Sequence, residues 1–319
     1  MLVSGSWLTA ARWSSRLDFR PLVSALDGGP RALARAGAPP AFVKEAAACP
    51  PAEVGAPLRS DAEGYPAALL ELAAPPPLLW AEGSLEVLTR PALAIVGARA
   101  CTPYGRLVAG RLAREVSQRG GVVVSGGARG VDSAAHSATF DGGATVAVLG
   151  GGLESAFTSA QGALHQGILS HGGLLLSEQP PLDRARRWTF PRRNRLIAAL
   201  GCATVVVEAA EGSGSLHTAR AAHALGRDVL AVPGRLGEAA SAGCLELIAQ
   251  GALCVTDLNA VADRVGQPMS RRLAGLLPAT PSELADGLEQ EPRAVMGLLA
   301  MLELRGIVRR MRDGRYGLR

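Results

Sequence analysis

Residues 91–105 read PALAIVGARACTPYG, and residues 121–132 read GVVVSGGARGVD. Each stretch is a short apolar run that ends in glycine and leads into a segment of helical composition. Apolar runs without a polar face are typical of strands buried on both sides, as in a parallel sheet covered by helices. The two stretches therefore predict consecutive strand–loop–helix units, with glycine at the carboxyl end of each strand.

The same alternation continues to about residue 266. Further apolar runs occupy residues 145–149, 173–176, 204–207 and 229–232, and helices are expected at 105–119, 131–141, 161–171, 193–200 and 215–226. This order predicts an α/β fold of the extended Rossmann-like type, doubly wound around a mostly parallel sheet. A chain of 319 residues has room for about two or three domains.

The flanks of this Rossmann-like domain, placed at residues 91–266, differ from it in composition. Residues 1–60 contain short helical stretches broken by Gly and Pro, and they predict a small helical domain. Residues 61–90 are rich in proline, which predicts an extended connector. In residues 277–319, two helical stretches precede two strands around an Asp-Gly turn. That order predicts a winged helix.

The composition narrows the class of protein. The net charge is +5, and Lys44 is the only lysine. Arginine pairs bidentately with phosphates and stacks on bases, which lysine cannot do. The five cysteines are scattered and the five histidines lack metal-ligand spacing, so we expect neither a disulfide framework nor a metal site. The sequence shows no signal peptide and no long apolar run, so we expect a cytoplasmic protein without membrane contact.

Glycine-containing loops follow the expected strands. In the first loop, the helix start after Thr102 offers free amides to an anion, and Arg99 adds a phosphate donor. Because the carboxyl ends of parallel strands share one edge of a sheet, the loops predict a common groove for an anionic ligand. The candidate binding residues of these loops are Gly97, Arg99, Ser125, Gly126, Gly127, Arg129, Gly212, Ser213, Gly214 and Ser215.

The motifs of common nucleotide-binding and catalytic sites are missing from the sequence. Neither a G-x-G-x-x-G nor a Gly-Lys-Ser/Thr element occurs, so we expect no NAD, no ATP and no other cofactor. A G-x-S-x-G elbow is absent, and neither a Cys/His pair nor a couple of acidic residues stands out. We therefore predict a binding protein without catalytic residues.

The densest basic segment is RARRWTFPRRNR, residues 184–195, with six arginines in twelve residues. Arginines pair with phosphates and aromatic rings stack on unpaired bases, and a single strand exposes both groups. The alternative is a solvated basic loop with Trp188 and Phe190 packed inward. The candidate residues of this segment are Arg186, Arg187, Phe190, Arg192, Arg193 and Asn194.

In this order the motifs resemble the DNA-processing protein A family (DprA, also called Smf). The resemblance is carried by Tyr65-Pro66 and by residues 95–105, 125–136, 190–198 and 205–218. It implies a homodimer that binds single-stranded DNA, protects incoming or exposed strands and loads a RecA-type recombinase onto them. Natural transformation and recombination are the implied processes, and single-strand-binding protein is the implied competitor.

The resemblance also assigns roles to single residues. It implies that Arg99 binds phosphate, that Arg187 is a basic residue of the pocket and that Phe190 stacks on a base. It implies that loops 125–127 and 212–215 line the pocket. It further implies that residues 1–60 form a SAM-like unit. The chain departs from the family pattern at residues 151–158, where many members have a Tyr-Pro and an Asn. The local shape of the pocket is therefore not predicted there.

Two other functions stay open from the residues alone. One is a nucleotide-processing enzyme of the related SLOG-like class, although its Pro-Gly-Gly-x-Gly-Thr-x-x-Glu signature is missing around Pro233-Gly234. The other is a winged-helix regulator that binds duplex DNA. Four arginines on the expected wing favour it, but four acidic residues make the same unit nearly neutral, which disfavours duplex binding.

Overall fold

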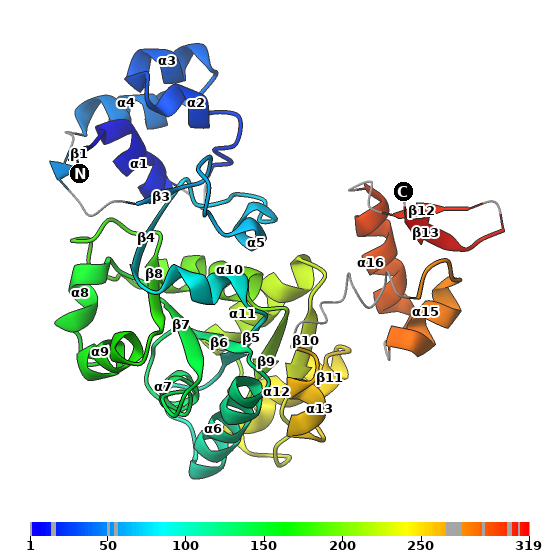
Figure 1. Cartoon of the computed structure of the whole chain (residues 1–319). Coiled ribbons are helices and arrows are strands. Elements are labelled where there is room, and N and C mark those ends of the chain that lie inside the picture. The colour runs from blue at the N-terminus through cyan, green and yellow to red at the C-terminus, as the bar shows by residue number, and fades with distance from the viewer. Residues whose placement is uncertain are drawn as a thin grey trace.

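The computed structural model describes residues 2–13, 17–49, 52–53, 57–265, 276–288, 291–304, 308–311 and 313–318. The expected end of the Rossmann-like domain at residue 266 lies outside these residues. Figure 1 shows a helical N-terminal unit next to a layered α/β unit, followed by a small C-terminal unit.

The α/β unit is built on a sheet of nine strands, counted over the described residues. Their order is β11–β10–β9–β5–β6–β7–β8–β4–β3. All neighbours from β11 to β8 are parallel, and β4 and β3 add antiparallel strands at one edge. The predicted doubly wound, mostly parallel fold is confirmed. The strands are β3 (Leu58–Arg59), β4 (Leu78–Gly83), β5 (Ala92–Val96), β6 (Val122–Ser125), β7 (Ala144–Val148), β8 (Leu174–Ser177), β9 (Ala203–Val206), β10 (Asp228–Ala231) and β11 (Leu253–Cys254).

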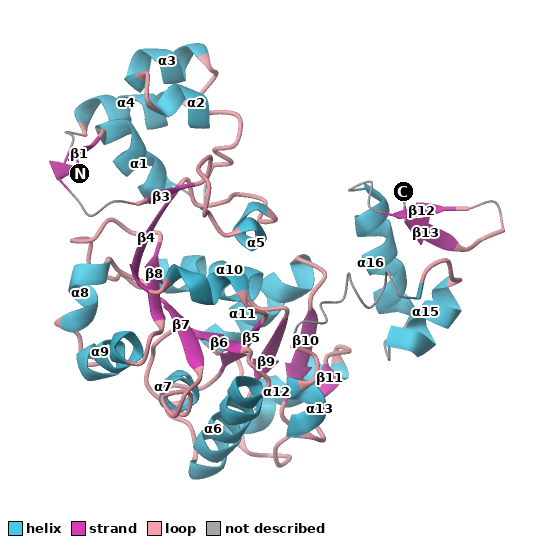
Figure 2. Ribbon diagram, viewed as in Figure 1, coloured by secondary structure: helices cyan, strands magenta, loops and turns pink. Residues whose placement is uncertain are grey.

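Helices cover both faces of the sheet (Figure 2). Leu93 and Ile95 of β5 pack with α6 and α7, whereas Ala94 and Val96 face the cluster that contains α10 and α11. This alternation is what a strand buried on both faces requires. The helices are α5 (Ala67–Leu70), α6 (Pro103–Gln118), α7 (Val131–Ser137), α8 (Leu153–Phe157), α9 (Gly162–Ser170), α10 (Thr189–Leu200), α11 (Gly214–Ala224), α12 (Ala239–Ala249) and α13 (Leu258–Ala262), with the 3-10 helix η1 (Leu85–Thr89).

The predicted extended connector at residues 61–90 contains the helical elements α5 and η1, and its extended part is a strand of the sheet. Strand β4 belongs to the sheet and pairs with β8, with Trp80 opposite Ser177. Leu78, Leu79 and Trp80 are all buried. Three consecutive apolar residues directly after the prolines form a strand because both of its faces are covered.

The described residues of the N-terminal unit form four helices and a short strand pair. Its Trp7 and Phe42 belong to one apolar cluster with Trp80 and Leu175 of the sheet. The unit therefore shares a continuous core with the β4–β8 edge, and its assignment as SAM-like stays a prediction. The elements are β1 (Leu2–Val3), α1 (Gly5–Trp13), α2 (Val23–Leu26), α3 (Gly29–Arg35), α4 (Pro40–Ala48) and β2 (Ala52–Glu53).

The C-terminal unit has its own core, with Leu284, Leu299 and Tyr316 buried together. Its first helix starts with a reciprocal cap, in which the Thr280 backbone donates to Glu283 Oε2 at 2.7 Å and the Glu283 backbone donates to Thr280 Oγ1 at 3.3 Å. The observed order agrees with the expected one, and the winged-helix assignment stays a prediction. The elements are α15 (Pro281–Leu288), α16 (Pro292–Leu304), β12 (Val308–Arg310) and β13 (Tyr316–Leu318).

Helices long and apolar enough to cross a bilayer are absent from the part of the chain that the structure describes.

Candidate nucleic-acid interface

The crevice at the switch point of the sheet is filled by the chain itself. Strand β5 lies between β6 and β9, and ligands of open α/β sheets usually bind at such a point. The Glu208 carboxylate enters here and accepts hydrogen bonds from the Thr102 backbone at 2.8 Å and from Thr102 Oγ1 at 2.5 Å. The prediction of free amides in the helix start after Thr102 is wrong for Gly105, whose backbone donates to Thr102 Oγ1 at 3.1 Å. Glu208 takes the place of the expected anion there.

A pocket of about 300 Å³ lies beside this crevice, at the ends of β6 and β7. We call it the Phe190 pocket. It brings together Arg99, the Gly126–Gly127 loop, Arg129 and Phe190, which the sequence placed in one groove. Much of the remaining lining is glycine backbone and small apolar side chains. Such a surface suits a flat, weakly polar group.

Arg99 and Phe190 form the best-defined pair in this pocket. The exposed Arg99 guanidinium lies over the half-buried Phe190 ring, with its central carbon 4.9 Å from the ring centroid. This separation allows a cation–π contact. Gly150 is required behind the ring, because a Cβ there would come within 2.9 Å of it. One face of the pocket thus combines an aromatic ring with a positive charge.

The backbone amides of the second glycine loop face inward. Gly126 and Ala128 donate to Asp132 Oδ2 at 3.2 and 3.3 Å. Burial raises the pKa of Asp132, although the nearby Arg193 charge and these hydrogen bonds oppose the shift. These two amides are already bonded within the protein, so the loop gives a ligand close access to the backbone instead of a ring of free donors.

Arg192 and Arg193 are buried on α10 and bond to the protein. Arg192 donates to the Ala11 and Arg12 carbonyl oxygens and pairs with Glu178 at 3.2 Å. Arg193 donates to the Val148 carbonyl oxygen at 2.5 Å, and burial lowers its pKa to about 10. Neither guanidinium lines the Phe190 pocket, although that of Arg193 packs directly against Gly126 in its wall.

The remaining serine and asparagine candidates have structural partners. Ser125 Oγ donates to the Ile95 carbonyl oxygen at 2.5 Å, and the Asn194 amide donates to the Gly214 carbonyl oxygen at 3.0 Å. Ser213 caps α11 by accepting from the Ser215 backbone. Gly97 lets β5 approach Val131 closely. These residues, together with Gly212, do not line the Phe190 pocket, and their part in binding stays a prediction.

Arg129, Arg186 and Arg187 are exposed. Arg129 borders the Phe190 pocket, whereas Arg186 lines a different pocket and Arg187 lines neither. Among the described residues, groups of three or more His, Cys, Asp or Glu that could hold a metal ion are absent.

A model of the family described as DNA recombination-mediator protein A matches residues 57–266, which is most of the chain. The chain belongs to this family. Relatives within it are similar over long stretches. A Mycobacterium tuberculosis (strain H37Rv) relative is 42% identical over 267 residues, which are 76% of this chain and 68% of the relative. The predicted resemblance to the DprA/Smf family is confirmed.

Two solved structures of family members share the fold. The X-ray structure of DNA processing protein A from Streptococcus pneumoniae is 30% identical, covers 83% of this chain and 99% of its own, and has a TM-score of 0.69. A DNA processing protein A from Helicobacter pylori is 31% identical, covers 65% of this chain and 94% of its own, and has a TM-score of 0.60. Its structure is described as giving insight into a unique single-stranded DNA binding mode.

The sequence did not predict several residues that line the Phe190 pocket. Some of them lie at or next to residues 151–158, where the chain departs from the family pattern. Gly150, Gly151 and Gly152 form one wall of the Phe190 pocket. Three consecutive glycines at the end of an expected strand were a usable signal. His165 also lines the pocket, and burial lowers its pKa. Its Nδ1 lies 3.0 Å from the Ala156 carbonyl oxygen, and Nε2 has no partner among the described residues.

Proposed function

We propose that this chain binds single-stranded DNA in the Phe190 pocket. The observation that carries the proposal is the Arg99 guanidinium over the Phe190 ring, on the wall of a glycine-lined pocket. Arg99 covers one face of the Phe190 ring, so on binding the Arg99 guanidinium would turn to the neighbouring phosphate and leave that face to a stacked base. The glycine backbones let the strand approach closely.

The pocket favours a single strand over a duplex. A volume of about 300 Å³ is at the lower end of the range for small-molecule sites and suits one base. Bases in a duplex are stacked on one another, so they cannot enter without being flipped out. The description of the Helicobacter pylori relative as binding single-stranded DNA supports the same choice.

The strand is proposed to be passed on to a RecA-type recombinase, in competition with single-strand-binding protein. Membership in a family of recombination mediators supports this step. The protein would act as a homodimer and would need no cofactor. A mediator works by binding and transfer, so we assign no residue a catalytic role.

The first test is the binding of a labelled oligonucleotide and its duplex to the wild type and to Phe190→Ala. The wild type is expected to prefer the single strand, and the substitution to weaken that binding by about tenfold, since a stacked base contributes roughly 1–3 kcal/mol.

Phe190→Leu and Phe190→Tyr are matched controls for this test. Leucine keeps the apolar contact with Gly150 but loses the ring, so it should resemble alanine, whereas tyrosine should bind like the wild type. Equal affinity of the wild type for single strand and duplex would contradict the proposal. Loading is then tested by whether the wild type, but not Phe190→Ala, restores recombinase activity on a strand coated with single-strand-binding protein.

A further inference from the structure

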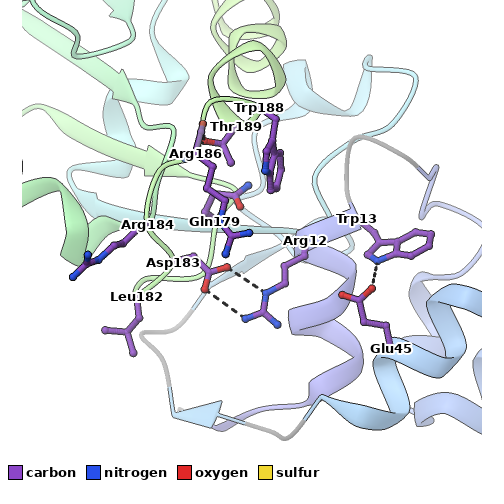
Figure 3. A pocket seen from close by; sticks show the side chains of 10 residues that line it. All are labelled: Arg12, Trp13, Glu45, Gln179, Leu182, Asp183, Arg184, Arg186, Trp188 and Thr189. Carbon is purple, nitrogen blue, oxygen red and sulfur yellow. Dashed lines mark hydrogen bonds and ion pairs between the residues drawn. The ribbon is translucent and has the colours of Figure 1, made fainter.

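We propose that a second pocket, between the N-terminal helical unit and the segment 179–189, binds another nucleotide of the same single strand. The inference rests on the proposed DNA binding and extends it to a surface that the family motifs do not touch. The pocket has a volume of about 530 Å³, within the usual range of about 300–1,000 Å³ for ligand sites. Figure 3 shows Arg12, Trp13 and Glu45 on one side and the segment 179–189 on the other.

The walls of this second pocket are held in place from both sides. Arg12 Nε pairs with Asp183 Oδ2 at 3.2 Å, which links α1 to the opposite segment. The buried Arg192 donates to the carbonyl oxygens of Ala11 and Arg12 at 2.5 and 2.6 Å, so the end of α1 is fixed on α10. A ligand would therefore meet a preformed site and would not have to order it.

Gln179 is the observation that points to a ligand. Its side chain lines the pocket and is only 3% exposed, and its Nε2 has no hydrogen-bond partner within the described residues. A buried amide donor without an acceptor is costly to the folded protein. A ligand that presents an oxygen, such as a phosphate or a base carbonyl, would satisfy it.

Trp188 and Arg186 identify the class of ligand. Trp188 is 44% exposed although it is a large aromatic side chain. Arg186 is exposed and, within the described part of the chain, pairs with no carboxylate. The two acidic groups of the pocket are already bonded, Asp183 to Arg12 and Glu45 to the Trp13 indole. The Arg192 guanidinium lies over one side of the Trp188 ring, 5.6 Å from its centroid, and the rest of the ring is exposed. An unpaired guanidinium next to this exposed aromatic surface fits a nucleotide, with its base on Trp188 and its phosphate on Arg186.

The second pocket and the Phe190 pocket are neighbours along the chain. Ala185 lines the Phe190 pocket, and Arg186 lines the second one. A strand that leaves one pocket can therefore continue into the other along this segment. A free nucleotide carries the same base and phosphate as a strand, so the experiment must distinguish a free nucleotide from a single strand.

The experiment measures the binding of oligothymidylates of increasing length to the wild type, Arg186→Gln and Trp188→Ala. The wild type should gain affinity when the strand becomes long enough to reach both pockets. Each variant should lose about tenfold on long strands and bind the shortest strands like the wild type. Arg111→Gln removes one exposed charge from α6, outside both pockets, and is the matched control that should behave like the wild type at every length.

Tryptophan fluorescence reports on the pocket directly. Long strands should quench part of the emission of the wild type, and this part should be missing in Trp188→Phe, which keeps a ring for stacking and should retain affinity. If the variants bind all lengths like the wild type while Phe190→Ala is weakened, the second pocket is overturned and the proposed function stands. If thymidine monophosphate quenches Trp188 and strands do not, the pocket takes a free nucleotide and the strand assignment is overturned. If the wild type binds no strand, the proposed function and this inference are both wrong.

Discussion

The two halves of the arginine-rich segment have different environments. Arg184, Arg186 and Arg187 in its first half are exposed, whereas Arg192 and Arg193 in its second half are buried. The first half is a loop and the second lies on α10. The fold thus divides one run of like charges into two sets. The exposed arginines can bind a polyanion, and the buried arginines bond to other parts of the protein and stabilise the fold.

Glu178 explains the division. It follows β8 directly and is almost fully buried, and Arg192 and Arg195, three residues apart on one face of α10, both pair with it. Residues three apart are neighbours on a helix surface, so one carboxylate can meet both. Charge density alone therefore does not identify the arginines that bind a ligand. The position of each arginine on its element decides it.

The largest expected effect comes from breaking the buried half. Arg192→Met should lower the free energy of unfolding by about 3–5 kcal/mol, because Glu178 loses a buried partner and two carbonyl oxygens lose their donor. Denaturant unfolding followed by circular dichroism measures it. Arg187→Met, in the exposed half, is the matched control and should change stability by less than about 0.5 kcal/mol. Equal effects of the two substitutions would show that the division does not exist.

Burial of a titratable group should also make the stability of the protein depend on pH. His136 is fully buried, and burial, with smaller contributions from His165 and Arg193, lowers its pKa from 6.5 to about 3. Between these values the unfolded chain binds a proton that the folded chain does not, so stability should fall as the pH drops below about 6.5. One such group loses about 1.4 kcal/mol per pH unit, or about 2 kcal/mol at pH 5.

His136→Gln is the variant that isolates this effect. Glutamine can still reach Thr145 Oγ1, which His136 Nδ1 contacts at 2.7 Å, but it does not titrate. The free energy of unfolding, measured from pH 7 to pH 4, should fall less steeply with decreasing pH in the variant. The difference in slope should correspond to the uptake of one proton fewer on unfolding. An unchanged slope would mean that His136 does not control this pH dependence.

The smallest effect on stability is expected in the exposed half, where binding changes instead. Arg187→Gln and Arg99→Gln should leave the unfolding free energy within about 0.5 kcal/mol of the wild type. Each should reduce the salt dependence of single-strand binding by about one unit of slope, because one phosphate contact is lost. Oligonucleotide titrations over a range of salt concentrations measure this. A slope that neither substitution changes would remove both arginines from the interface.

The sequence predicted the framework of the fold well, because buried parallel strands have an unmistakable pattern. All six expected strands of the α/β unit lie within one or two residues of their observed positions. Strand β4 was missed because its apolar residues directly follow three prolines, and the proline-rich stretch predicted a connector outside the sheet. The site was predicted in part. Arg99, Gly126, Gly127 and Phe190 do meet in one pocket, since strand ends share an edge.

The partners of the other candidates could not be predicted, because they depend on contacts between distant segments. Arg192 meets the end of α1 about 180 residues away in the sequence, and Asp132 binds the amides of the second loop from the following helix. No local pattern reports such pairings. The second pocket could not be predicted for the same reason. Its walls come from the N-terminal helices and from the segment 179–189, which are far apart in the sequence.

Glu208 also has a consequence for competition between ligands. The carboxylate is part of the chain and is bonded to the start of α6, so its effective local concentration is fixed by the fold. A free phosphate or nucleotide has to exceed that concentration to enter the switch-point crevice, and tethered groups commonly correspond to millimolar levels or more. An anion that binds at the start of α6 would thus have to displace the Glu208 carboxylate first.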